Sequence, residues 1–115
     1  MKKTISLKKN YEFSRVYKKG RFFAGKYIAM HVLRNNYGYN RLGITVSTKF
    51  GKSVKRNRIR RLIRENYRLH EDFVRDGYDI VFVARKQDVM PEYRQIENEM
   101  KFLMAKLGVL RRNGG

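Results

Sequence analysis

The residues best suited to chemistry lie in the densely basic segment from Lys52 to Arg68, whose only acidic residue is Glu65. On a helical projection of about 100° per residue, this segment divides into two faces. The apolar face consists of Ile59, Leu62, Ile63, Asn66 and Tyr67. The opposite face, here called the arginine face, consists of Arg58, Arg60, Arg61, Arg64 and Arg68. The pattern predicts a helix that packs on a core and presents guanidinium groups to a partner.

The arginine face is unfavourable in an isolated helix. Like charges at i,i+4, as in the series Arg56, Arg60, Arg64 and Arg68, each cost roughly a few tenths of a kcal/mol. A planar guanidinium can bind two phosphate oxygens or a base edge, and it can also stack. The alternative is a solvated charged face, but such faces usually mix both signs. We therefore expect this face to bind a polyanion.

A second candidate site lies near the N-terminus, where Phe13 and Tyr17 are spaced one helical turn apart among basic residues. Single-stranded RNA is held by basic grooves with aromatic platforms, on which each stacked base is worth about 1–3 kcal/mol. An amphipathic helix also needs an aromatic stripe to pack against a core. From the residues alone, a stacking site and a core position are both open for this pair.

Catalysis by protein side chains is not expected. His31 and His70 fall in different elements, and neither has a nucleophile or metal ligand at motif spacing. Glu12 and Asp79 are isolated acids that we expect to be solvated, and His70 ends a helix as a dipole partner or surface residue. The chain has no cysteine, which excludes disulfides and cysteine-based metal sites.

The net charge of +18 over 115 residues is unusual for a domain with eight Tyr and seven Phe. Residues 1–68 hold 20 Lys and Arg and two acids, whereas residues 69–115 hold eight of each sign. Nucleic acid is the expected partner, because phosphate neutralisation releases counterions. A membrane would require free apolar residues on a basic helix, so neither a membrane nor a small-molecule partner is expected. We predict one RNA-binding domain over residues 1–110, a frayed tail over 111–115, and a cytoplasmic location.

Hydrophobic periodicity predicts alternating elements. Helices are expected over residues 8–19, capped by Asn10 or Ser6, and over 54–70 and 92–107, with Pro91 at the first position of the third. Strands are expected over 22–33, possibly split near Gly25, over 41–47, and over 78–85 as the central strand. The order αββαβα or αβββαβα indicates an α+β sandwich, with helices on a small mixed sheet.

The run from Lys49 to Glu65, centred on Arg56-Asn57-Arg58, resembles the signature of the bacterial ribonuclease P protein subunit and its RNR motif. The similarity extends over roughly residues 7–105, through Leu7 to Asn10, Leu42 to Ser47, and Tyr78 to Val81. The resemblance implies an αβββαβα-type two-layer sandwich with a left-handed βαβ crossover, an exception to the usual handedness.

The resemblance also implies a function. Ribonuclease P is an endoribonuclease that removes the 5′ leader from precursor tRNA, and its RNA subunit carries the chemistry with Mg²⁺. The protein would bind this RNA and the precursor tRNA. A ribosomal protein or an RNA chaperone, a non-enzymatic module of similar charge, is the competing function class.

The resemblance assigns residues to two sites. One site would contact the catalytic RNA through Lys52, Arg56, Asn57, Arg58, Arg60, Arg61, Arg64 and Arg68. The other would be a central cleft that binds the leader through Phe13, Tyr17, Tyr27 and His31. His31 occupies a family position that is often aromatic, and an imidazole can also stack on a base. No catalytic or metal-ligating residue is expected in the protein.

Overall fold

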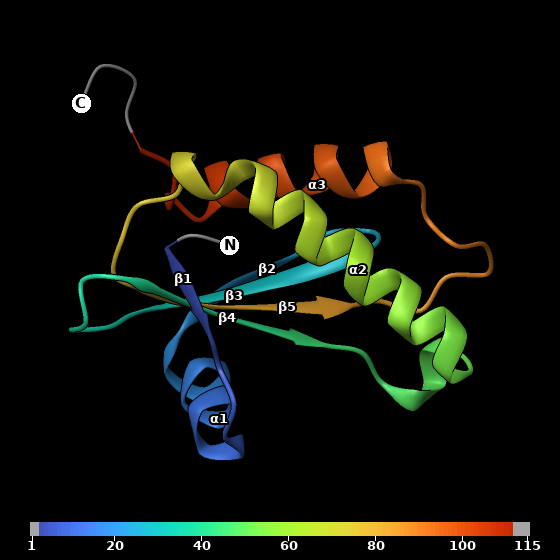
Figure 1. Ribbon diagram of the computed structural model, residues 1–115, viewed down its shortest axis with the longest axis horizontal. Helices are drawn as coiled ribbons and strands as arrows, with labels where there is room; N and C mark the ends of the chain where they lie inside the picture. The colour runs from blue at the N-terminus through green and yellow to red at the C-terminus, as the bar shows by residue number, and fades with distance from the viewer. Residues whose placement is uncertain (1–2, 112–115) are drawn as a thin grey trace.

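The computed structural model describes residues 3–111, which form one five-stranded sheet flanked by three α-helices (Figure 1). The strands are β1 (Thr4–Ser6), β2 (Arg21–Ala24), β3 (Ile28–Arg34), β4 (Asn40–Thr45) and β5 (Tyr78–Ala84). The α-helices are α1 (Asn10–Lys19), α2 (Ser53–His70) and α3 (Tyr93–Lys106). Two 3₁₀ turns, η1 (Thr48–Phe50) and η2 (Glu71–Phe73), flank α2.

The sheet has the strand order β1-β4-β5-β3-β2, with β5 at its centre as predicted. β5 pairs in parallel with β4 and antiparallel with β3, so the sheet is mixed. The predicted strand over 22–33 is split into β2 and β3, which pair antiparallel. β1 was not predicted from the sequence. Its three residues pair in parallel with β4 at the edge, and so short a segment carries little periodicity.

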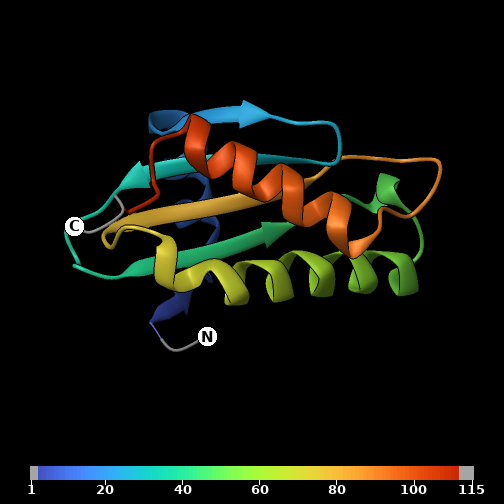
Figure 2. The same ribbon diagram turned by 90° about the horizontal axis from the view of Figure 1, so that it is seen from above.

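The connection from β4 through α2 to β5 is a parallel crossover that places the predicted arginine helix across the sheet. Figure 2 views the molecule with α2 on the near side of the sheet and β4 below β5, both strands running to the right. This arrangement makes the crossover left-handed, opposite to the great majority of βαβ units. The fold is thus the α+β mixed sheet that the sequence predicted.

The helices cover both faces of the sheet. α1 packs on one face through Val16 against Val81, while Ile80 and Phe82 of the same strand join the larger core under α2 and α3. Alternating strand residues point to opposite faces, so β5 is apolar at nearly every position. α1 therefore adds a third layer to the predicted two-layer sandwich, as Figure 1 shows.

Helix starts differ from the predictions because backbone groups are satisfied in other ways. α1 begins at Asn10 after Lys9, and the carboxylate of Glu12 accepts the backbone N–H groups of Lys8 and Lys9 at 3.0 and 2.9 Å. Neither Asn10 nor Ser6 caps the helix. Pro91 lies before Glu92, the N-cap of α3, and so is outside the helix rather than at its first position.

The C-terminal region is better anchored than predicted. The backbone N–H of Arg111 donates to the carbonyl of Phe73, and its side chain pairs with Asp76 at 2.9 Å. Arg111 therefore belongs to the folded domain. The rest of the predicted tail, residues 112–115, lies outside the described residues.

Candidate nucleic-acid interface

The arginine face of α2 forms as the periodicity predicted. Ile59, Ile63, Asn66 and Tyr67 are buried against the rest of the core, and Leu62 is half-buried. Arg58, Arg61, Arg64 and Arg68 are exposed, as is Lys52 at the N-cap. Arg56 and Arg60 are half-buried, because they lie at the border between the two faces.

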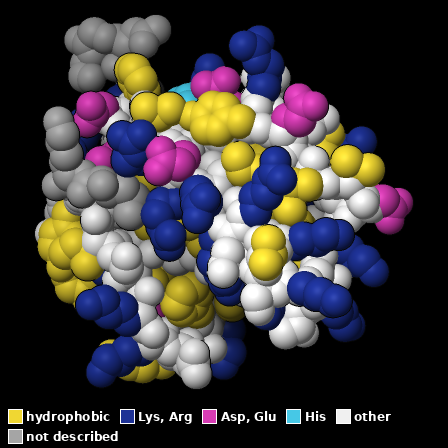
Figure 3. Space-filling model, turned by 45° about the vertical axis from the view of Figure 1, so that its right-hand side comes forward, with side chains coloured by type: hydrophobic (Ala, Val, Ile, Leu, Met, Phe, Trp, Pro, Cys, Tyr) yellow, Lys and Arg dark blue, Asp and Glu magenta, His cyan; other side chains and the backbone are white. Residues whose placement is uncertain are grey.

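The members of this face differ in their intramolecular partners. Arg68 pairs with Glu65 at 2.9 Å, and Arg60 donates to the side-chain oxygen of Asn57 at 3.3 Å. Arg58, Arg61 and Arg64 make no side-chain hydrogen bond or ion pair with any residue from 3 to 111. Figure 3 shows Lys and Arg side chains spread over the middle and right of one side, with acidic side chains mostly in its upper part. These guanidinium groups are free to bind an external anion.

A cleft of about 430 Å³ lies between α1, the end of β4 and the middle of α2. Its lining residues are Asn10, Phe13, Ser14, Tyr17, Ile44, Thr45, Val46 and Arg60. The ring of Phe13 lies directly over Gly43, where an added Cβ would sit 2.3 Å from it. Phe13 therefore packs on the sheet and also forms one wall of the cleft. The core position and the stacking site that its sequence position left open are compatible.

An aromatic cluster extends the cleft across the α1 side of the sheet. The rings of Tyr17 and His31 meet edge to face at 4.9 Å, and His31 stacks on Phe22 at 5.1 Å with 18° between the planes. The hydroxyls of Tyr17 and Thr45 share a hydrogen bond of 3.0 Å. Phe22 is 62% exposed, so one large apolar ring faces solvent beside the cleft.

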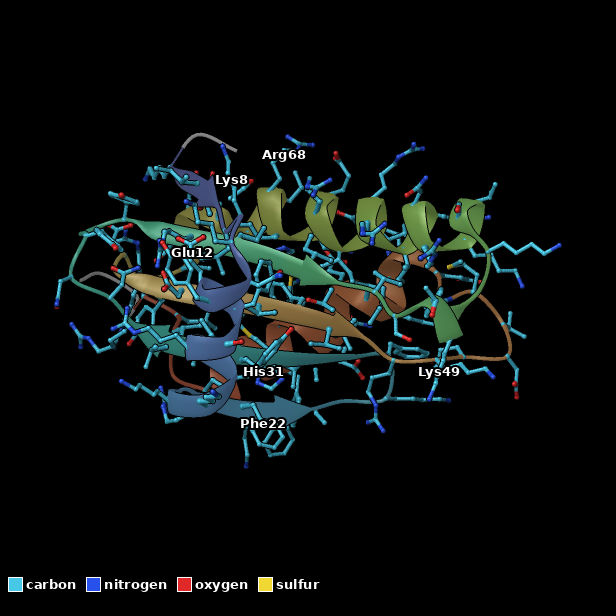
Figure 4. The ribbon with its side chains drawn as sticks, turned by 90° about the horizontal axis from the view of Figure 1, so that it is seen from below. Lys8, Glu12, Phe22, His31, Lys49 and Arg68 are labelled. Carbon is cyan, nitrogen blue, oxygen red and sulfur yellow. The ribbon has the colours of Figure 1, made fainter. Side chains whose placement is uncertain are left out.

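Phe22 is a candidate site residue that the sequence reasoning missed. Figure 4 looks onto the α1 side and shows Phe22 beside His31. The two residues are paired across β2 and β3. Because strand neighbours on one face are in contact, splitting the strand at Gly25 and aligning its halves could have found Phe22. That alignment requires a register that the sequence alone does not specify.

The surroundings of His31 favour its neutral form. It is half-buried between Tyr17 and Phe22, and burial lowers its pKa below the ordinary value for histidine. A neutral imidazole offers a flat face for stacking with little cost of desolvation. The histidine is therefore suited to the stacking role that its family position implies.

Tyr27 was predicted to join the cleft, and the structure separates it from the other three residues. It packs against the core on the α3 side, and its hydroxyl accepts a hydrogen bond from Gln95 at 2.9 Å. The carboxylate of Glu99 binds its backbone N–H at 2.7 Å. Tyr27 lies in the turn before β3, where the alternation of strand faces does not apply, so its side chain does not follow that of His31.

Arg60 connects the two regions. It was predicted to face the catalytic RNA with the other arginines, but it also lines the cleft with Phe13 and Tyr17. The cleft thus has an aromatic wall on α1 and a cationic wall on α2. Such a pairing suits a single strand, whose bases can stack while a phosphate meets the guanidinium.

The two acids expected to be solvated instead bind Arg41. Its guanidinium donates to Glu12 at 2.6 Å and to both oxygens of buried Asp79 at 2.8 and 2.7 Å. Burial opposes ionisation of Asp79, but hydrogen bonds from Arg41 and Asn35 outweigh it and hold the pKa of Asp79 below its ordinary value. Backbone N–H groups of Lys9 and Lys8, with Arg41, similarly lower the pKa of Glu12. These groups form a structural network.

The other histidine also has a structural place. His70 lies within hydrogen-bond distance of the carbonyl of Asn66, with 2.7 Å between Nδ1 and the oxygen, and its Nε2 is 3.8 Å from Glu97. Between residues 3 and 111 no three His, Asp or Glu side chains are grouped so that they could hold a metal ion. Over the same residues, no helix is both long and apolar enough to span a membrane.

Comparisons with known proteins identify the family. Residues 1–108 match the sequence model of the family described as Ribonuclease P. The ribonuclease P protein component of Alkaliphilus oremlandii is 44% identical over 110 residues, covering 96% of each chain. That of Clostridium kluyveri is 48% identical over 105 residues, covering 90% of this chain and 94% of its own.

Solved structures show the same fold. The RNase P protein of Staphylococcus aureus aligns with a TM-score of 0.82 and 35% identity, over 92% of this chain and 97% of its own. The RNase P protein of Thermotoga maritima aligns with a TM-score of 0.76 and 28% identity, over 87% and 96% respectively. The chain therefore belongs to the ribonuclease P protein family.

Proposed function

We propose that this chain is the protein subunit of a ribonuclease P holoenzyme, which assists endonucleolytic removal of the 5′ leader from precursor tRNA. One observation carries the proposal beyond family membership. A helix face whose Arg58, Arg61 and Arg64 have no side-chain partner among residues 3–111 lies beside an aromatic cleft, and the two share Arg60. This arrangement supports simultaneous binding of a structured RNA and a single strand.

The arginine face is the proposed contact with the catalytic RNA. Arg58, Arg61 and Arg64 extend from successive turns of one rigid helix, so they can meet phosphates along a folded RNA surface. Bidentate guanidinium–phosphate bonds position such a surface without reading its sequence. Lys52 and Arg56, with Asn57 of the RNR motif, extend this contact toward the N-terminus of α2.

The cleft is the proposed binding site of the leader. Phe13, Tyr17 and His31, together with Phe22, offer ring surfaces along one side of the sheet, and Arg60 offers a cation on the other wall. Stacking is tolerant of sequence, because every base has a π-face. The cleft would therefore accept leaders of varied sequence, as expected for an enzyme with many precursor substrates.

The RNA subunit would carry out the hydrolysis, with Mg²⁺ bound mainly by RNA. Between residues 3 and 111 no side-chain group suited to a metal is present, and Glu12 and Asp79 are already occupied by Arg41. The residues described do not fit a protein-held ion. The proposed contribution of the protein is binding and positioning, and the cytoplasm is the proposed compartment.

A reconstitution assay tests the proposal. Precursor tRNA and a bacterial ribonuclease P RNA would be combined at low Mg²⁺, with and without the protein, and leader cleavage would be measured. We expect the protein to increase cleavage and to raise affinity for precursor over mature tRNA. The matched control is mature tRNA, which lacks the leader, combined with the same ribonuclease P RNA.

The outcome separates the proposal from a general RNA chaperone. A chaperone of the same charge would bind both tRNAs equally and would not favour the precursor. No gain in leader cleavage, together with equal affinity for the two tRNAs, would reject the proposed function while leaving RNA binding intact.

A further inference from the structure

A stacked pair of tyrosines lies in the loop between β3 and β4, outside both regions described above. The rings of Tyr37 and Tyr39 are 5.4 Å apart with 22° between their planes. They are 51% and 36% exposed, which leaves much of their ring surface in solvent. The proposed contacts with catalytic RNA and leader do not use them.

The loop that carries this tyrosine pair is held in place by Asn35. Its side-chain oxygen accepts the backbone N–H of Tyr37 at 3.0 Å, and its amide donates to the carbonyl of Tyr39 at 3.2 Å. The same amide donates to buried Asp79 at 2.8 Å. One side chain thus ties both tyrosine backbones to the interior of the sheet.

Arg41 supports the pair from below. Its guanidinium carbon lies 4.6 Å from the centre of the Tyr37 ring. The guanidinium is itself fixed by Glu12 and Asp79 at distances of 2.6 to 2.8 Å. A cation–π contact to an immobile cation restricts the ring. The exposed ring surface is therefore ordered before any ligand arrives, which lowers the entropy cost of binding.

The pair is separate from the cleft. Tyr37 and Tyr39 precede the first residue of β4, whereas the cleft is lined by residues 44–46 at the opposite end of that strand. Figure 1 shows the β3–β4 loop at the end of the sheet away from the start of α2. In Figure 4, Glu12, which binds Arg41, lies on the side of α1 away from Lys49. α1 therefore lies between the tyrosine pair and the cleft.

We propose that Tyr37 and Tyr39 form a second stacking site for an unpaired nucleobase of single-stranded RNA. Exposed, preordered rings are what base stacking requires. The chain carries a net charge of +18, all of it within the first 68 residues that include this loop, so the molecule as a whole attracts a polyanion. Arg34 is exposed at the end of β3, where the loop begins, and its guanidinium carbon lies 5.8 Å from the centre of the Tyr78 ring. It is the cation that we expect to meet a phosphate next to the stacked base.

Affinity for a short oligouridine, measured without any catalytic RNA, tests the site. The double variant Tyr37→Ala/Tyr39→Ala should weaken binding about five- to 150-fold, the range expected for one lost base stack. The matched control, Tyr37→Phe/Tyr39→Phe, keeps the rings and should bind like the unaltered protein. Binding is compared at raised salt, where the phosphate contribution is reduced, and thermal unfolding shows whether each variant is folded.

Photocrosslinking locates the contact in the unaltered protein. Trypsin cuts after Arg34 and Arg41, so both tyrosines are released in one peptide, residues 35–41. The same digestion places Phe13, Tyr17, Phe22 and His31 in other peptides. With an oligonucleotide containing 5-iodouridine, we expect crosslinks to the 35–41 peptide as well as to cleft peptides.

Two results would overturn the inference. One is equal oligouridine affinity of the alanine and phenylalanine double variants when both are folded. The other is crosslinking confined to the cleft peptides, which would leave the proposed leader site standing and remove this one.

Discussion

The arginines of this molecule occur in two contrasting settings. On α2, Arg58, Arg61 and Arg64 are exposed and have no side-chain partner between residues 3 and 111. On the α1 side of the sheet, Arg41 is held by three hydrogen bonds to Glu12 and Asp79, with the side chain 12% exposed. The same residue type thus forms an exposed charged surface on α2 and a mostly buried ion-pair network beside α1.

The difference shows how to distinguish arginines that bind a partner from arginines that stabilise the fold in a strongly basic sequence. A guanidinium that donates three of its five N–H groups to carboxylates and is mostly buried is poorly available to RNA, and removing it would leave buried Asp79 uncompensated. A guanidinium without partners repels its neighbours until an external anion arrives. Mutations in the two settings should therefore change different measurements.

The largest effect is expected from Arg41→Met. Breaking a buried ion pair by removing one partner typically costs about 3–5 kcal/mol, so the free energy of unfolding from denaturant titration should fall by that amount. Arg58→Met, an exposed arginine of α2, is the matched control and should change stability little. If both variants were equally stable, Arg41 would have to be reclassified as a surface cation.

The second effect concerns affinity, not stability. Changing Arg58, Arg61 and Arg64 together to Ala should weaken binding to a ribonuclease P RNA by about tenfold for each lost phosphate contact near 0.1 M salt. The slope of log affinity against log salt should become shallower by about 0.7–0.9 per contact. The control is the triple variant Lys86→Ala/Arg94→Ala/Lys101→Ala, which removes the same amount of charge from residues 69–115, where the net charge is zero. An unchanged slope in the α2 variant would place the RNA surface elsewhere.

A smaller effect is expected in the cleft. Phe22→Ala should reduce the preference for precursor over mature tRNA by about five-fold or more, because one base stack is lost. Phe102→Ala on α3 removes another exposed ring, 54% exposed compared with 62% for Phe22, and should leave that preference unchanged. Equal effects of the two variants in a tRNA binding assay would argue against a specific leader path.

The smallest effect is a pH dependence from His31. Burial lowers its pKa in the folded state, so the unfolded state takes up the proton first as pH falls. The contribution to stability is complete above the unfolded pKa of about 6.5 and is lost as pH falls through the lower folded value. His31→Phe should flatten the change in unfolding free energy between about pH 7 and 5. A slope identical to that of the unaltered protein would assign the titration to other groups.

Strong local patterns predicted much of the fold. The arginine face of α2 follows from a period of 3.6 residues, and the near-continuous apolar run of β5 indicated a central strand. Both patterns lie within one element, and both are confirmed by burial in the structure. The left-handed crossover came from the family resemblance, because nothing in the periodicity of residues 40–84 specifies handedness.

The sequence by itself determined which side chains of α2 face outward and where the positive charge is concentrated, because helical geometry depends only on nearby residues. Only the tertiary structure decided which residues meet across elements. Strand register brought Phe22 from β2 beside His31 of β3 and Tyr17 of α1. It also moved Tyr27 to the α3 side. These contacts depend on pairing between distant segments, and a one-residue shift of register would turn each strand side chain to the opposite face.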